Sequence, residues 1–154
     1  MKEIVNLLLN NESFDPYESD ISYALYVSRS EITKELINNK DIDVNYVHFD
    51  RDTNVHHKIN SYKSVLMKSV INNDKEKVEI IIQHRSFDKN KSMLNKAIFI
   101  SVKKKRNQIF IKLLQQVNND INIIQHNKQK LFDYVISCKS YKIIDEIFNN
   151  LNID

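Results

Sequence analysis

One segment of this chain collects side chains of the types that bind metal ions. The segment 46–63 contains three histidines and two aspartates, and imidazole and carboxylate groups are common ligands of zinc and related metals. No Cys or His pair in it has the spacing of an established metal site, and a histidine-rich loop is usually solvated surface. We therefore expect no metal site and no cofactor. The five side chains are His48, Asp50, Asp52, His56 and His57.

Cys138 is the single cysteine and the obvious candidate nucleophile. It follows Val135-Ile136-Ser137 at the expected end of a helix, where a small packed residue is the usual role. The chain contains no glycine, so it has no Gly-rich phosphate loop and no Gly-x-Ser-x-Gly elbow. We expect no catalytic residues and no enzymatic activity. A lone cysteine cannot form an internal disulfide, which favours a reducing compartment: the cytoplasm, with the nucleus as the other intracellular option.

The run Lys103-Lys104-Lys105-Arg106 is the one cluster of like charge. Overall charge is only +3, from 23 basic and 20 acidic side chains, which is too small to favour general polyanion binding. In one interpretation the run complements the negative end of a helix dipole and is solvated. In others it contacts an acidic partner or forms a nuclear import signal.

Short amphipathic helices must position these groups. The 154 residues, 42% of them hydrophobic, suffice for one domain, and no run of 18 apolar residues predicts a membrane span. Apolar residues recur at helical spacing in 64–71 and again in 78–82, with Asn72-Asn73-Asp74 between them. Helices of two or three turns are marginal alone, so they must pack against neighbours.

The pattern repeats along the chain. Residues Ser64, Ala97 and Lys130, taken as the openings of successive first helices, are 33 residues apart. A fixed period of 20 to 50 residues indicates a stacked repeat array. We expect one domain built of units at about 1–18, 19–63, 64–96, 97–129 and 130–154, with an insertion at 46–63 that makes the second unit longer.

The third unit resembles an ankyrin repeat. Ser64-Val65-Leu66-Met67-Lys68-Ser69 is similar to the family's Thr-Pro-Leu-His-x-Ala inner helix, and Lys77-Val78-Glu79-Ile80-Ile81-Ile82 to its outer helix. Asp43-Val44-Asn45 and Phe87-Asp88-Lys89-Asn90 stand at the family's Ala-Asp-Val-Asn exit. The resemblance covers nearly the whole chain. It implies an all-α fold, an ankyrin-type solenoid of stacked helix-turn-helix repeats with one long hairpin-loop insertion.

The chain departs from the family pattern at the turns. The family's Thr-Pro cap is absent, and its turn glycines are replaced, for example by Asn73 and Lys139. The Ser64 hydroxyl can still cap a helix, whereas Ala97 and Lys130 cannot. Asparagine pairs such as Asn72-Asn73 and Asn118-Asn119 are expected at helix ends. Recurring aromatic residues are expected first of all in the core: Tyr23, Tyr26, Phe99, Phe110, Phe132 and Phe148.

The resemblance also implies a function: a non-catalytic module that binds another protein through a concave groove and hairpin tips. Most of the charged contact positions are basic, so we expect a partner with an acidic surface rather than nucleic acid or a membrane. The alternatives are a helical regulatory domain that contacts nucleic acid or another polyanion through Lys103–Arg106, and a structural fragment that needs another protomer. The oligomeric state stays open. The family's contact positions fall on Tyr62, Lys63, Asn72, Asn95, Lys96, Lys104, Lys105, His126, Lys128, Gln129 and Ser137.

Overall fold

A computed structural model describes residues 3, 7, 11, 18–39, 42–50, 61–90, 92–117, 125–126 and 129–150. This part of the chain is mostly helical, an all-α fold with two short antiparallel hairpins. Its helices are α2 (Glu18–Val27), α3 (Ser30–Asn39), α4 (Val65–Ile71), α5 (Lys75–Gln83), α6 (Leu94–Lys103), α7 (Asn107–Gln115), α8 (Leu131–Ser137) and α9 (Tyr141–Asn150). Its strands are β1 (Val47–Asp50), β2 (Ser61–Ser64), β3 (Gln125–His126) and β4 (Gln129–Lys130).

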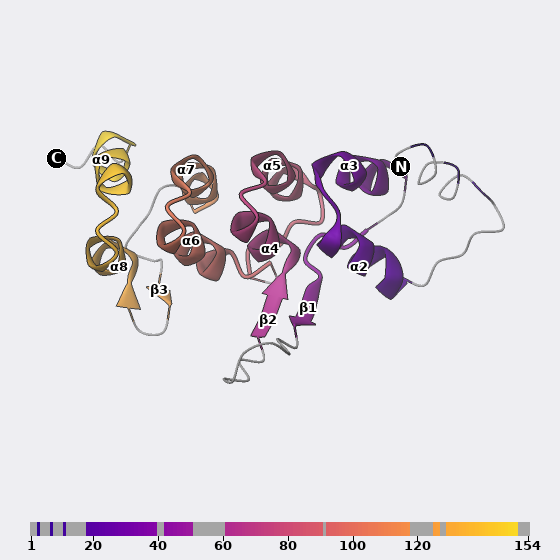
Figure 1. Cartoon of the computed structure of the whole chain (residues 1–154), viewed down its shortest axis with the longest axis horizontal. Helices are drawn as coiled ribbons and strands as arrows, with labels where there is room; N and C mark the ends of the chain where they lie inside the picture. The colour runs from indigo at the N-terminus through magenta and orange to yellow at the C-terminus, as the bar shows by residue number, and fades with distance from the viewer. Residues whose placement is uncertain are drawn as a thin grey trace.

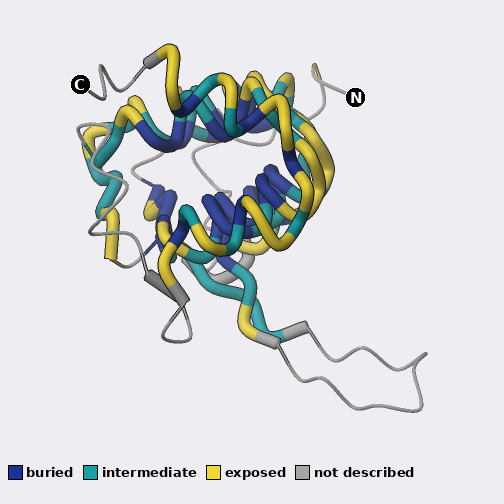
Figure 2. The backbone as a smooth tube through the Cα atoms, turned by 90° about the vertical axis from the view of Figure 1, so that its left-hand side faces the viewer, coloured by how far each residue is buried: buried dark blue, intermediate teal, exposed yellow. Residues whose placement is uncertain are grey.

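The helices form two layers. The inner layer holds α2, α4, α6 and α8, and the outer layer holds α3, α5, α7 and α9 (Figure 1). Each helix packs against the partner that follows or precedes it in the chain and against its neighbours in the same layer. Pair α2/α3 lies at one end of the row and pair α8/α9 at the other, and buried residues face the space between the layers (Figure 2).

Tight turns join the two helices of a pair, and these turns recur along the chain at a nearly constant spacing. Three of these turns place a residue in the left-handed region: Asn73 (φ 58°), Lys105 (φ 54°) and Lys139 (φ 49°). They are 32 and 34 residues apart, which averages to the predicted 33. Asn73 and Lys139 were expected at turn-glycine positions, and their positive φ angles agree with that expectation.

Two of the three predicted helix starts, at Ser64 and Lys130, agree with the structure, and the third, at Ala97, does not. The Ser64 hydroxyl accepts a hydrogen bond from the Met67 N–H at 3.2 Å, as a serine N-cap should. Lys130 precedes α8 without a side-chain cap. The prediction that a helix opens at Ala97 is wrong, because α6 begins at Leu94. Leu94 is 1% exposed, and its burial in the core adds almost a turn to the start of this helix.

Asparagines end several helices. Asn72 is the C-cap of α4, and α3 and α9 end at Asn39 and Asn150. The α7 helix is an exception, since it ends at Gln115, before the predicted Asn118-Asn119 pair. That pair lies outside the described residues.

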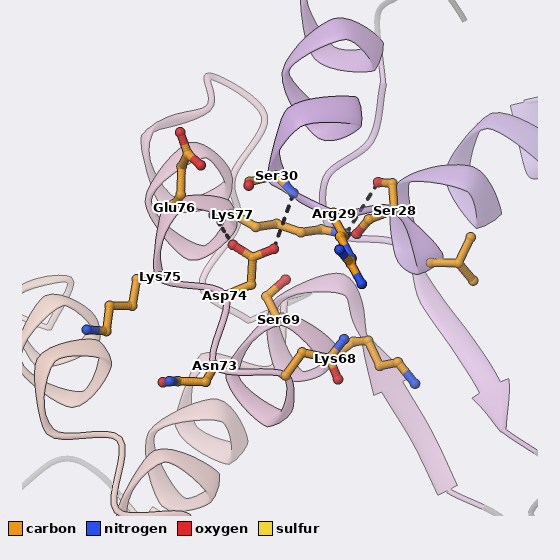
Figure 3. Close-up of a pocket in the computed structure, with 12 residues that line it drawn as sticks. Ser28, Arg29, Ser30, Lys68, Ser69, Asn73, Asp74, Lys75, Glu76 and Lys77 are labelled. Atoms are coloured by element: carbon orange, nitrogen blue, oxygen red, sulfur yellow. Dashed lines mark hydrogen bonds between the residues drawn. The ribbon is translucent and has the colours of Figure 1, made fainter. Parts of the chain in front are cut away.

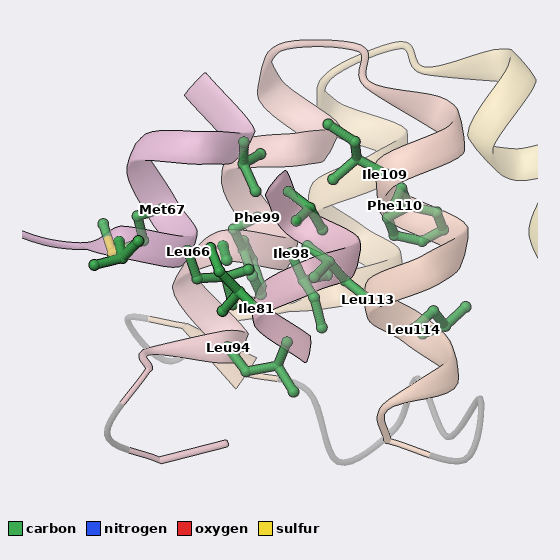
Figure 4. Packing of buried hydrophobic residues seen from close by; sticks show 14 of the residues in the cluster. Leu66, Met67, Ile81, Leu94, Ile98, Phe99, Ile109, Phe110, Leu113 and Leu114 are labelled. Atoms are coloured by element: carbon green, nitrogen blue, oxygen red, sulfur yellow. The ribbon is translucent and has the colours of Figure 1, made fainter. Parts of the chain in front are cut away.

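The core runs continuously through the helix pairs (Figure 4). Phe110, Ile98 and Ile109 are fully buried, and Phe99 is 4% exposed. Tyr26 is also buried, so the aromatic prediction holds for Tyr26, Phe99 and Phe110. It is wrong for Tyr23 and Phe148, which are 46% and 53% exposed. Phe132 is half-buried.

The expected insertion begins and ends as paired strands. Strands β1 and β2 are antiparallel, with Val47 opposite Ser64 and Asp50 opposite Ser61. They project from the inner layer between α2 and α4 (Figure 1). Residues 51–60, which include His56 and His57, lie outside the described residues.

Asparagine-aspartate exits join successive pairs. Asp43 and Asp88 each accept the backbone N–H two residues further on, at 2.9 and 2.8 Å. Asn45, which is 6% exposed, donates to the Ser86 carbonyl at 2.6 Å and accepts from the Asp88 N–H at 2.8 Å. The repeated motif therefore stabilises the stack, because one copy satisfies the backbone of the next.

Candidate partner-binding surface

The β1–β2 hairpin presents an exposed aromatic residue next to a lysine. Phe49 and Tyr62 are opposite each other in the register, and their ring centroids are 5.0 Å apart. Tyr62 is nevertheless 60% exposed. Lys63 is the next residue, on the other face of the strand opposite His48. Tyrosine is one of the residues enriched in protein interfaces.

An aromatic cluster fastens this hairpin to the inner layer. We define the aromatic cluster as Tyr23, Tyr26, Tyr46 and His48. The His48 ring lies 5.0 Å from the Tyr23 ring and 4.9 Å from the Tyr26 ring, and 6.4 Å from that of Tyr46. Lys68 of α4 places its Nζ atom 5.4 Å from the centre of the Tyr26 ring, a cation–π contact between neighbouring pairs. The hairpin therefore has a fixed base, from which Tyr62 extends.

Asn95 and Lys96 lie on the same side of the stack as the β1–β2 hairpin, in the first turn of α6. They were expected before the fourth inner helix and instead lie inside it. Both line a cavity of about 470 Å³ together with Lys89 and Met93. Met93 has φ 58° and ψ 44°, a conformation that is strained for a residue with a long side chain. Among the described residues that line the cavity are two lysines and no acidic residue.

Four predicted contact residues lie on the opposite side, at the turns within pairs. Asn72 and Lys104 are the C-caps of α4 and α6, Lys105 follows in the left-handed region, and Ser137 ends α8. All four are exposed. The Ser137 hydroxyl donates to the Tyr134 carbonyl at 2.8 Å. The predicted contacts therefore lie in two rows, one on the hairpin side and one at the turns within pairs. The rows are about 15 Å apart, the length of the ten-residue helix α6.

The remaining predicted contacts belong to the short β3–β4 hairpin. His126 is opposite Gln129 in its register, so both lie on the hairpin side, in the row of Tyr62 and Lys96. Lys128 lies outside the described residues.

The basic run is exposed through its lysines only. Lys103, Lys104 and Lys105 are exposed at the end of α6, whereas Arg106 is half-buried and opens α7. Lys105 lines a cavity of about 370 Å³ between this turn and the next, together with Lys139 and Lys142, and the described residues of the lining include no acidic side chain. Positive charge therefore gathers between the turns of the last two described pairs.

A cavity between the first two turns contains a feature that the sequence analysis missed. It measures about 690 Å³ and lies between the α2–α3 and α4–α5 turns (Figure 3). Asp74 caps α5, accepting from the Lys77 N–H at 3.0 Å, and also accepts from the Ser30 N–H at 3.2 Å. Lys77 is only 2% exposed. Its Nζ atom donates to the Leu25 carbonyl and, at 2.6 Å, to the Ser28 carbonyl at the end of α2.

Lys77 occupies a position that is apolar in the other pairs. It is the third residue of α5, and the third residues of α7 and α9 are Ile109 and Ile143, both fully buried. The repeat alignment was the signal that could have identified it. Burial lowers the pKa of the Lys77 ammonium from 10.5 to about 8, against the opposing attraction of Asp74. A cation is therefore held in the stack by helix-end carbonyls and one carboxylate.

The candidate metal and nucleophile residues can be placed within the described part of the chain. Across them no group of three His, Cys, Asp or Glu side chains is close enough to hold a metal ion. Cys138 is the half-buried C-cap of α8. Burial, together with a hydrogen bond to Cys138, raises the pKa of Tyr134, so this phenol stays protonated at neutral pH.

Comparison with protein-family models, curated proteins and solved structures finds no match for this chain. Of the helices in the described ranges, none has both the length and the apolar character needed to cross a bilayer.

Proposed function

We propose that the chain is an ankyrin-type solenoid whose hairpins and inner-helix ends bind another protein. The solenoid is supported by helix pairs that stack in one row, by turns 32 and 34 residues apart, and by hairpins between pairs. It is also supported by the Asn45 hydrogen bonds, which repeat the exit motif as a structural link between units. Each pair contacts its neighbours in the row, as in other repeat arrays.

One observation carries the binding function: Tyr62 is 60% exposed on a hairpin whose base is fixed by the aromatic cluster. A rigidly presented tyrosine contributes contact area at small entropic cost. Lys63 and Lys96 add positive charge on the hairpin side, and Lys104 and Lys105 add it at the turns on the opposite side of the stack, about 15 Å away. We therefore expect a protein partner with an acidic surface, bound without covalent chemistry.

Affinity capture with the intact chain tests this proposal. We expect Tyr62→Ala to weaken capture of the partner, because truncating an interface tyrosine commonly costs more than about 1 kcal/mol. The double substitution Lys104→Glu/Lys105→Glu should weaken it further and leave the unfolding transition in place. The charge control is Lys34→Glu/Lys112→Glu, which changes the net charge equally on the outer layer. Because both lysines form ion pairs there, the unfolding transition of this variant is measured beside its capture. Equal capture by all variants would reject the surface.

A second candidate function rests on the cavity lined by Lys105, Lys139 and Lys142. Three lysines suit phosphate groups, and the described residues that line the cavity with them include no acidic side chain. In this alternative the same turns would contact nucleic acid or another polyanion. Binding would then weaken steeply with salt, and removing one lysine would lower the slope by about one. A protein partner captured equally well at low and moderate salt would disfavour this alternative.

A further inference from the structure

The outward face of the last helix pair carries apolar side chains. We define the C-terminal face as Phe132, Ile136, Ile144 and Phe148, on α8 and α9. Ile136 and Phe148 are 51% and 53% exposed, and the Phe132 and Phe148 rings meet edge to face at 6.3 Å. Figure 2 looks onto this end of the stack.

On α8, this face has apolar residues at positions that, in the preceding pairs, join one pair to the next. Ile136 stands three residues before the left-handed residue of its turn, and so do Val102 and Val70 in the two preceding pairs. Val70 and Val102 are fully buried. The exposed isoleucine therefore occupies a stacking position that no described pair covers.

The outer helix shows the same pattern. Phe148 stands nine residues after Lys139, and Leu114 stands nine residues after Lys105. Leu114 is 2% exposed and Ile82, nine residues after Asn73, is half-buried, whereas Phe148 is 53% exposed. The C-terminal face thus has the same apolar character as the interfaces between pairs inside the stack.

We propose that this face binds a second copy of the chain, the two copies meeting C-terminal face to C-terminal face about a two-fold axis. The apolar positions that bury one pair against the next are then buried against their equivalents in the partner. Such a contact is isologous, so it closes at a dimer.

Charge argues against the other arrangement, in which a second copy continues the row head to tail. Between α5 and α7, Glu79 and Lys112 form an ion pair at 2.9 Å. By the spacing of the helix pairs, Asp145 corresponds to Glu79, and Glu35 of α3 corresponds to Lys112. A continued row would place these two carboxylates opposite each other. It would also leave open ends that grow into filaments.

Sedimentation equilibrium of the whole chain tests the proposal, from low to high micromolar concentration. We expect the unsubstituted chain to approach twice its monomer mass. Ile136→Glu and Phe148→Glu should each raise the dimer dissociation constant about tenfold or more, because each would bury a charge in the contact. The matched control is Val27→Glu on α2, where the valine is 54% exposed and lies at the other end of the row. Circular dichroism checks that each variant remains folded.

Four results would overturn the proposal. The first is a monomer at every concentration. The second is a dimer that Ile136→Glu and Phe148→Glu leave intact. The third is open-ended growth instead of a dimer. The fourth is a chain that dimerises only after residues 151–154 are removed, since the chain's own end would then cover the face. The dimer does not depend on the proposed binding function, because Tyr62 and the C-terminal face are changed separately.

Discussion

Replacing Lys77 with methionine should remove a specific pH dependence of stability. In the folded chain Lys77 is 2% exposed and its pKa is lowered to about 8 by burial. In the unfolded chain the Lys77 ammonium is solvated, so its pKa returns to the ordinary value of 10.5. Methionine has nearly the same length and cannot be charged, so the substitution isolates the titration of this group.

The sign follows from which state holds the proton. Below pH 8 the group is protonated in both states, and the folded chain bears the full cost of a buried cation. Between pH 8 and 10.5 the unfolded chain binds the proton and the folded chain has released it, so stability rises with pH. One pKa unit corresponds to about 1.4 kcal/mol, so the total effect is about 3 kcal/mol. Most of this, about 2 to 3 kcal/mol, should be gained between pH 7 and pH 10.

Urea unfolding followed by circular dichroism at several pH values in this range measures the effect. The free energy of unfolding of the unsubstituted chain minus that of Lys77→Met should rise with pH, whatever constant offset the lost hydrogen bonds introduce. Ile109→Met is the control, because it changes the equivalent position of the next pair and should leave the pH dependence unchanged. Parallel curves for the unsubstituted chain and Lys77→Met would show that Lys77 is not a buried titrating group, and would refute the reasoning.

Further predictions concern the exits, the turns and the ends. Asn45→Ala should lower the free energy of unfolding by about 2 to 4 kcal/mol, because it leaves the Ser86 carbonyl and the Asp88 N–H unpaired; exposed Asn90→Ala should change it by less than about 0.5 kcal/mol. Lys105→Gly should raise the melting temperature, by relieving about 1 kcal/mol of left-handed strain, and Lys104→Gly should not. Hydrogen exchange should show lower opening free energies for α2 and α3 than for α6 and α7. Equal protection would contradict a weak contact between the pairs α2/α3 and α4/α5.

The sequence predicts local features well where one side chain determines them. Ser64 caps α4 through its hydroxyl because serine at that position has an acceptor within reach of the Met67 N–H. Asn73 takes the left-handed conformation because, without glycine, asparagine tolerates it best. Apolar periodicity likewise predicts the helix pairs, since a short helix must bury its apolar side.

What the sequence does not predict depends on neighbours. The start of α6 moved from Ala97 to Leu94 because Leu94 finds space in the core, which local propensity cannot show. Phe148 has the pattern of a core residue and is exposed only because no described pair follows α9. Burial of Lys77 was overlooked because a lysine near a helix start is usually solvated. The separation of Lys96 from Lys104 follows from the length of the helix between them.

The junctions of the stack are not equivalent, and Lys77 makes the difference. Between α4/α5 and α6/α7, fully buried residues such as Ile109 and Ile98 form the contact. Between α2/α3 and α4/α5, a buried ammonium replaces the isoleucine found in later pairs, and its burial opposes its charge at neutral pH. In a row where each unit contacts only its neighbours, stability is a sum of such junctions, so the row should open first at the weakest one. The pair beyond that junction carries Tyr23 and Tyr26, against which the β1–β2 hairpin packs through His48. A partner that contacts both the hairpin and the inner helix ends would therefore hold this junction closed, and binding would be coupled to the order of the first pair.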